Sequence, residues 1–140
     1  MKILGIEHIG IAVSNMEKNA PFWKLLLNNN APITEEIIGQ KVVTEIFDTG
    51  QGKIELLEAT SQDSAIGKFI EKRGQGIHHI CLQVENIKQA IEELREAGVE
   101  LIDKIPRIGA EGYLIVFIHP RSTGGVLVEL AEKSVIQEYE

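Results

Sequence analysis

The sequence has few of the features that mark secreted, membrane or nucleic-acid-binding proteins. A single cysteine, Cys81, excludes an intramolecular disulfide and suits a reducing compartment. No apolar run approaches the roughly 18 residues that a membrane-spanning helix needs, and no signal-sequence pattern is present. Basic residues are scarce: 14 Lys and Arg against 21 Asp and Glu give a net charge of −7, which disfavours nucleic acid as a partner. We therefore expect a cytoplasmic protein without membrane or nucleic-acid partners.

The composition is that of an ordinary globular protein. Hydrophobic residues make up 44% of the 140 positions and charged residues 25%. That length corresponds to one domain with a real hydrophobic core. Because the net charge is negative, an anionic ligand would need a local basic patch.

A segment near the start of the chain recurs in its second half. Residues 5–15 match residues 76–86, so that Gly5 corresponds to Gly76 and His8 to His79. Internal repeats reveal the structural unit of a chain. Each copy alternates apolar and other residues with the period of a strand, which places each histidine on the face opposite its apolar neighbours.

The ends of the two halves repeat as well. Residues 54–58, IELLE, resemble residues 128–132, VELAE, and place Glu55 and Glu129 at matching positions. A lone strand histidine is usually a surface residue, and a lone strand carboxylate is often an edge charge. The matched positions instead favour a divalent-metal site with His8, Glu55, His79 and Glu129 as ligands.

The remaining patterns predict two modules with the order β-α-β-β-β. The capping pattern Ser14-x-x-Glu17 predicts a helix to about Leu27, with Pro21 marking a kink or a later start. Its apolar residues Phe22, Leu25 and Leu26 are expected to face the sheet. Two further helices are predicted from Asp63 to Gly74 and from Asn86 to Gly98. After the repeated first strand of each half, strands are predicted over 34–38, 41–48, 53–59, 99–103, 113–118 and 126–132.

These elements predict an α+β fold with one domain over 1–135. Its first module would span 1–60 and its second 76–134, with a short helix over 63–73 between them. Two such modules would form a curved mixed sheet with helices outside. The two histidines and two glutamates would then line the inner face.

This arrangement resembles the vicinal oxygen chelate superfamily, and within it the methylmalonyl-CoA epimerases. The resemblance extends from Ile6 to Glu132 and is most specific in two runs, Asp63–Ile80 and His119–Leu130. Two positions depart from the epimerase pattern. Arg121 stands where that family usually has lysine, and Leu27-Asn28 replaces its common Leu-Gly.

The resemblance implies an isomerase that epimerises methylmalonyl-CoA at C2 through a metal-stabilised enolate. It implies one divalent ion per chain, with Co²⁺ expected before Mn²⁺, Ni²⁺ or Zn²⁺, an acyl-CoA substrate, and a homodimer. Glu129, or its counterpart Glu55, would act as one base. The family's second carboxylate falls at Thr44 in strict register, with Glu45 adjacent, and a metal-activated water is the alternative to either. Lys72, Arg107 and Arg121 are candidates for binding the CoA phosphates, and Ser122 is a further candidate substrate-binding residue.

Two other functions remain open at this point. Glyoxalase I uses a similar set of two histidines and two glutamates, with a glutathione hemithioacetal as substrate. Bleomycin-resistance proteins share the fold and bind their ligand without a metal. Fold alone does not choose among these functions.

Overall fold

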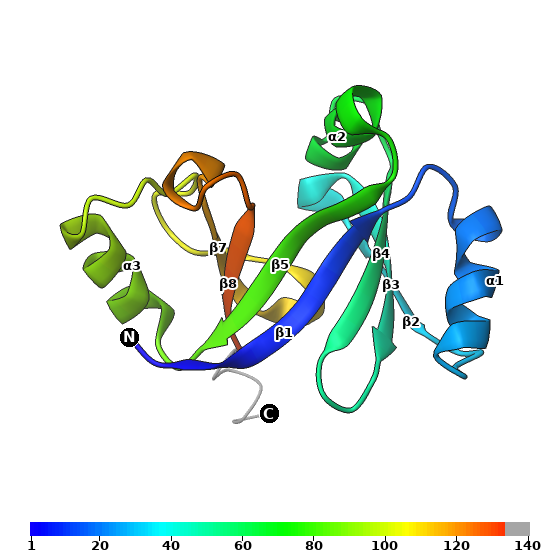
Figure 1. Ribbon diagram of the computed structural model, residues 1–140, viewed down its shortest axis with the longest axis horizontal. Helices are drawn as coiled ribbons and strands as arrows, with labels where there is room; N and C mark the ends of the chain where they lie inside the picture. The colour runs from blue at the N-terminus through cyan, green and yellow to red at the C-terminus, as the bar shows by residue number, and fades with distance from the viewer. Residues whose placement is uncertain (134–140) are drawn as a thin grey trace. The chain divides into compact units, whose positions relative to one another are not determined.

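The computed structural model describes residues 1–133, in which eight strands and three α-helices form (Figure 1). Three short 3-10 turns lie at Ile38–Gln40, Ala110–Gly112 and Pro120–Ser122. In chain order the main elements are β1 (Ile3–Ala12), α1 (Met16–Leu26), β2 (Ile33–Ile37), β3 (Val42–Asp48), β4 (Lys53–Ala59), α2 (Ala65–Arg73), β5 (Gly76–Val84), α3 (Ile87–Glu96), β6 (Arg107–Ile108), β7 (Leu114–Ile118) and β8 (Val128–Glu132).

The chain divides into two compact units. The N-terminal unit is His8–His78, and the C-terminal unit combines Met1–Glu7 with His79–Glu140. The order of elements repeats as β-α-β-β-β, from β1 to β4 and from β5 to β8. This confirms the expected α+β class and its tandem modules.

In the N-terminal unit the strands lie in the order β2-β3-β4-β1. β2, β3 and β4 are antiparallel to one another, whereas β4 and β1 are parallel. One face of this sheet packs on α1 through Val13, Phe47 and Leu56. The other face packs partly on α2, where Ile66 meets Leu57. The two helices therefore lie on opposite faces of the same strands.

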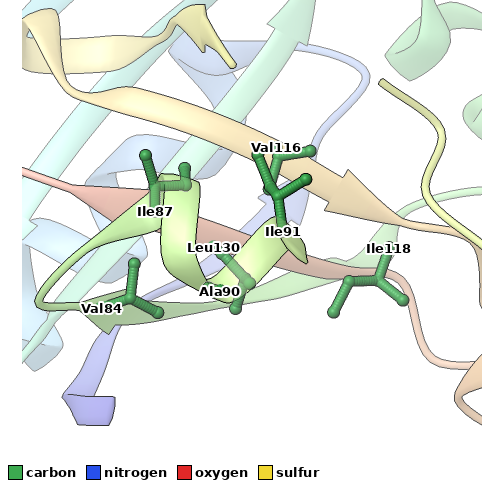
Figure 2. Packing of buried hydrophobic residues seen from close by; sticks show 7 residues of the cluster. All are labelled: Val84, Ile87, Ala90, Ile91, Val116, Ile118 and Leu130. Carbon is green, nitrogen blue, oxygen red and sulfur yellow. The ribbon is translucent and has the colours of Figure 1, made fainter. Parts of the chain in front are cut away.

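The C-terminal unit repeats this plan with the strand order β5-β8-β7-β6. β5 and β8 are parallel, and the remaining neighbours are antiparallel. The helix α3 packs one apolar stripe onto the sheet, with Ile87 and Ile91 against Val116 and Leu130 (Figure 2). Burying each such side chain stabilises the fold by about 1.5–3 kcal/mol relative to leaving it exposed.

The helix α1 corrects two sequence expectations. It begins at Met16, ahead of Pro21, because the side chain of Asn15 caps it by accepting from the Lys18 amide at 3.0 Å. The sheet-facing stripe consists of Met16, Ala20, Trp23 and Leu27. The residues expected there, Phe22, Leu25 and Leu26, are instead exposed.

Two other predicted boundaries were wrong. The cap of α2 is Ser64, whose hydroxyl accepts from the Gly67 amide, and Asp63 lies outside the helix. The segment 99–103 is not a strand, because only Leu101 forms an isolated bridge, to Ile118. The carboxylate of Asp103 accepts the Phe117 amide at 2.9 Å, where a strand would place a backbone carbonyl. The second strand of this module is therefore the short β6.

Among residues 1–133, no helix is long and apolar enough to span a membrane.

The pair Lys41–Asp63 gives a titration test of the loop before α2. Lys41 Nζ lies 2.8 Å from Asp63 Oδ2, and with the Ser61 hydroxyl it lowers the pKa of Asp63 from 3.8 to about 2. The pair therefore contributes stability above pH 3.8, and the contribution is lost as the pH falls through about 2. We expect Lys41→Gln to raise the Asp63 pKa, measured from its carboxyl ¹³C shift. An unchanged pKa would contradict the pairing.

Candidate metal centre and active site

In the N-terminal unit, a buried histidine and a buried glutamate are in contact. Glu55 on β4 pairs with Gly10 on β1, and His8 precedes Gly10 by two residues. Since side chains two apart on a strand share a face, His8 is the diagonal neighbour of Glu55. His8 Nδ1 lies 3.1 Å from Glu55 Oε2, and the two residues are only 6% and 3% exposed.

The C-terminal unit contains the same arrangement. Glu129 on β8 pairs with Cys81 on β5, and His79 precedes Cys81 by two residues. His79 Nε2 lies 3.3 Å from Glu129 Oε1, and both residues are 6% exposed. The sequence repeat is therefore also a repeat of strand register.

Each pair has the chemistry of a metal half-site. The residue opposite each glutamate is small, Gly10 in one unit and Cys81 in the other, which leaves room for the carboxylate to lean toward the histidine. Imidazole nitrogen and carboxylate oxygen bind divalent ions at about 2.0–2.2 Å. Two ligands at adjacent positions around one ion then lie about 3 Å apart, close to the separations observed in both pairs.

In the C-terminal unit, aromatic and apolar side chains surround the histidine. Phe117 pairs with Glu129 across β7 and β8, and its ring meets His79 edge-on, with centroids 5.7 Å apart. Cys81, Ile115, Phe117 and Ala131 form an apolar cluster on this face. Cys81 is fully buried in that cluster.

Comparison with known proteins identifies the family. The Glyoxalase/Bleomycin resistance protein/Dioxygenase superfamily matches residues 7–117. The chain belongs to this superfamily. It is 40% identical to an ethylmalonyl-CoA/methylmalonyl-CoA epimerase of Cereibacter sphaeroides, over 91% of this chain and 96% of that one. It is 37% identical to the human mitochondrial methylmalonyl-CoA epimerase, over 91% and 73%. The expected resemblance is thereby confirmed.

A solved structure of a superfamily member supports the same assignment. A methylmalonyl-CoA epimerase from Mycobacterium tuberculosis matches with a TM-score of 0.91 at 28% identity, covering 99% of this chain and 93% of that one. The fold expected from the sequence is therefore confirmed.

The register of β3 separates the two candidates for the family's second carboxylate. Thr44 pairs with Leu57 and Glu45 with Leu56, in an uninterrupted ladder from Val42 to Asp48. Thr44 thus shares a face with Glu55, whereas Glu45 lies on the face that packs on α1. The Thr44 hydroxyl is buried and donates to the Glu35 carbonyl at 3.1 Å. No bulge turns Glu45 toward the histidine.

The four candidate substrate-binding residues lie in different surroundings. Arg121 is exposed and binds Glu100 through a terminal nitrogen at 2.8 Å. The hydroxyl of Ser122 accepts from the Glu100 amide, so that these two residues hold the turn after β7. Lys72 lies in the last turn of α2. Arg107 differs from these, since its guanidinium lies over the Phe117 ring.

The register of β3 also yields a stability prediction. Glu45 Oε2 is buried with no hydrogen-bond partner, a state that costs about 1–3 kcal/mol. We expect Glu45→Met to raise the free energy of unfolding by about 1 kcal/mol, measured by urea denaturation, without changing metal affinity. The comparison variant Thr44→Val should lower it, because it removes the bond to Glu35. Loss of metal binding in Glu45→Met would contradict the facing assigned to Glu45.

Proposed function

We propose that this protein is a metal-dependent epimerase that interconverts (2R)- and (2S)-methylmalonyl-CoA. The observation that carries the proposal is the pair of equivalent His–Glu contacts, one in each unit, at the same strand register. It is supported by the relatives named as methylmalonyl-CoA epimerases, which align over nine-tenths of the chain. A solved methylmalonyl-CoA epimerase in complex with methylmalonyl-CoA also matches, with a TM-score of 0.88 at 30% identity, covering 96% of this chain and 98% of that one.

We propose that His8, Glu55, His79 and Glu129 together hold one divalent ion. Four protein ligands would saturate a tetrahedral Zn²⁺ site but leave two positions of a six-coordinate ion open. Co²⁺ is therefore the expected ion, before Mn²⁺ and Ni²⁺. Bound there, the ion would supply Lewis-acid stabilisation for the negative charge that develops on the substrate oxygens.

The protein's own groups would move the proton. The C2 hydrogen lies between a thioester carbonyl and a carboxylate, which makes it weakly acidic. We assign its removal to the Glu129 carboxylate. A threonine hydroxyl releases its proton far less readily than a carboxylic acid, so Thr44 is a poor proton donor for the second step. We assign the delivery of a proton to the opposite face of C2 to Glu55, the matching carboxyl group, which would carry that proton while Glu129 is ionised. The proton that Glu129 takes up would then be released to solvent.

The substrate would be recognised in the nonpolar surroundings of the histidines. The apolar cluster around Phe117 excludes water from one side of the His79–Glu129 pair. Exclusion of water strengthens electrostatic interactions with the developing charge. We further propose that the enzyme works as a cytoplasmic homodimer, as the family resemblance implies.

The first test of the proposed function is proton exchange at C2. We expect Co²⁺-loaded protein to incorporate deuterium into methylmalonyl-CoA in D₂O, followed by NMR. Glu129→Gln should lower the exchange rate by about 100-fold or more, because a neutral amide cannot accept the proton. The control Glu92→Gln, an exposed residue of α3, makes the same change in charge and should leave the rate unchanged.

Two results would contradict the epimerase function. Exchange no faster than in buffer with Co²⁺ alone is one of them. Conversion of the glutathione hemithioacetal of methylglyoxal, without exchange on methylmalonyl-CoA, is the other and would indicate glyoxalase I.

The shared metal site has a stoichiometric test. We expect calorimetric titration with Co²⁺ to give one ion per chain, and His8→Ala and His79→Ala each to abolish tight binding, since both pairs would hold the same ion. Two ions per chain, each lost with only one of these substitutions, would show that the pairs act separately.

A further inference from the structure

Arg107 lies on the same sheet face as the His79–Glu129 pair. It pairs with Ile115 across β6 and β7, and Ile115 lies in the same apolar cluster as Phe117. Its guanidinium carbon lies 5.6 Å from the centre of the Phe117 ring. That ring in turn meets His79 edge-on. A single aromatic side chain therefore separates a fixed positive charge from a candidate metal ligand.

Asp103 holds this arginine in place. One carboxylate oxygen, Oδ1, lies 3.4 Å from Arg107 Nε, while the other accepts the backbone amide of Phe117. The Asp103 side chain is 15% exposed, so its position is constrained by the surrounding chain. The same carboxylate thus orients the arginine and ties it to the strand that carries the aromatic ring.

The terminal nitrogens of Arg107 remain open to a ligand. Within residues 1–133, its guanidinium contacts are the Asp103 pair, through Nε, and the face of Phe117. The two terminal nitrogens form a fork that matches a carboxylate. In Arg121, by contrast, a terminal nitrogen is bound to Glu100. Arg107 is therefore the better-prepared anion-binding group of the two.

We propose that Arg107 binds the free carboxylate of the substrate's acyl group and selects α-carboxyacyl thioesters over uncharged ones, with Phe117 and Asp103 as positioning residues. This inference rests on the proposed function and deepens it. We assign the carboxylate as the ligand because Arg107 and the candidate metal ligand His79 both contact the Phe117 ring. The nucleotide phosphates of CoA are separated from the reacting carbon by the whole pantetheine arm.

The test compares ligands that lack one anionic part each. Calorimetry on Co²⁺-loaded protein would measure the Kd of methylmalonyl-CoA, of methylmalonyl-pantetheine, which lacks the nucleotide phosphates, and of propionyl-CoA, which lacks the carboxylate. We expect Arg107→Gln to weaken the first two by about 10- to 100-fold and propionyl-CoA by less than about 2-fold. Arg107→Lys should recover part of the loss. The control Lys88→Gln, exposed on α3, should change none of the three.

Three outcomes would overturn the proposal. Equal weakening of all three ligands would indicate a general structural effect. Weakening of both CoA thioesters but not of the pantetheine compound would assign Arg107 to the phosphates. Unchanged affinities would remove Arg107 from binding. Failure of the proposed function is distinguishable, because absent C2 exchange in the wild-type protein leaves these affinity ratios measurable.

The positioning residues have a separate kinetic test. Asp103→Asn keeps an oxygen that can accept the Phe117 amide but loses the charge that orients Arg107. Phe117→Leu keeps an apolar side chain but loses the cation–π contact. We expect both variants to raise KM for methylmalonyl-CoA by about 3- to 10-fold while kcat changes by less than about 2-fold. A fall in kcat at unchanged KM would refute the positioning function.

Discussion

The parallel pairing of β1 with β4, and of β5 with β8, is the constraint on which the candidate site depends. In each unit the pairing sets a glutamate opposite a small residue that lies two positions after a histidine. A shift of either register by one residue would turn that glutamate to the face that packs on α1 or α3. The repeated register thus preserves the same diagonal contact in two segments with limited sequence identity.

The two faces of each sheet differ in the kind of side chain that they bury. The faces packed on α1 and α3 are apolar and carry the larger buried clusters. The opposite faces carry the buried His–Glu pairs. Burying a charged group is costly unless another group compensates it, so each pair lowers the cost of burying its own members. Each pair therefore lies on the sheet face opposite the one that packs on α1 or α3, and the apolar core on that other face stabilises the strands that carry the pair.

The repeats are visible in the sequence because strand periodicity and matched positions are local patterns. These patterns alone lead to the prediction that groups His8, Glu55, His79 and Glu129. The facing of α1 is not predictable in this way, because Phe22 and Leu25 are as apolar as the residues that the sheet buries. The Asp103–Arg107–Phe117 arrangement also escapes prediction, since it depends on a loop side chain bonding to the backbone of β7. Tertiary bonding of that kind leaves no periodic signal.

The boundaries of the two sequence repeats differ from the boundaries of the two compact units, because each unit boundary falls within a strand, β1 or β5. Residues Met1–Glu7 are grouped with the C-terminal unit, and residues 76–78 of β5 with the N-terminal unit. The backbone amide of Glu85 donates to the Lys2 carbonyl at 3.0 Å, which ties the beginning of the chain to the loop before α3. Cutting the gene midway would consequently yield two polypeptides, each missing a strand segment that its own half requires.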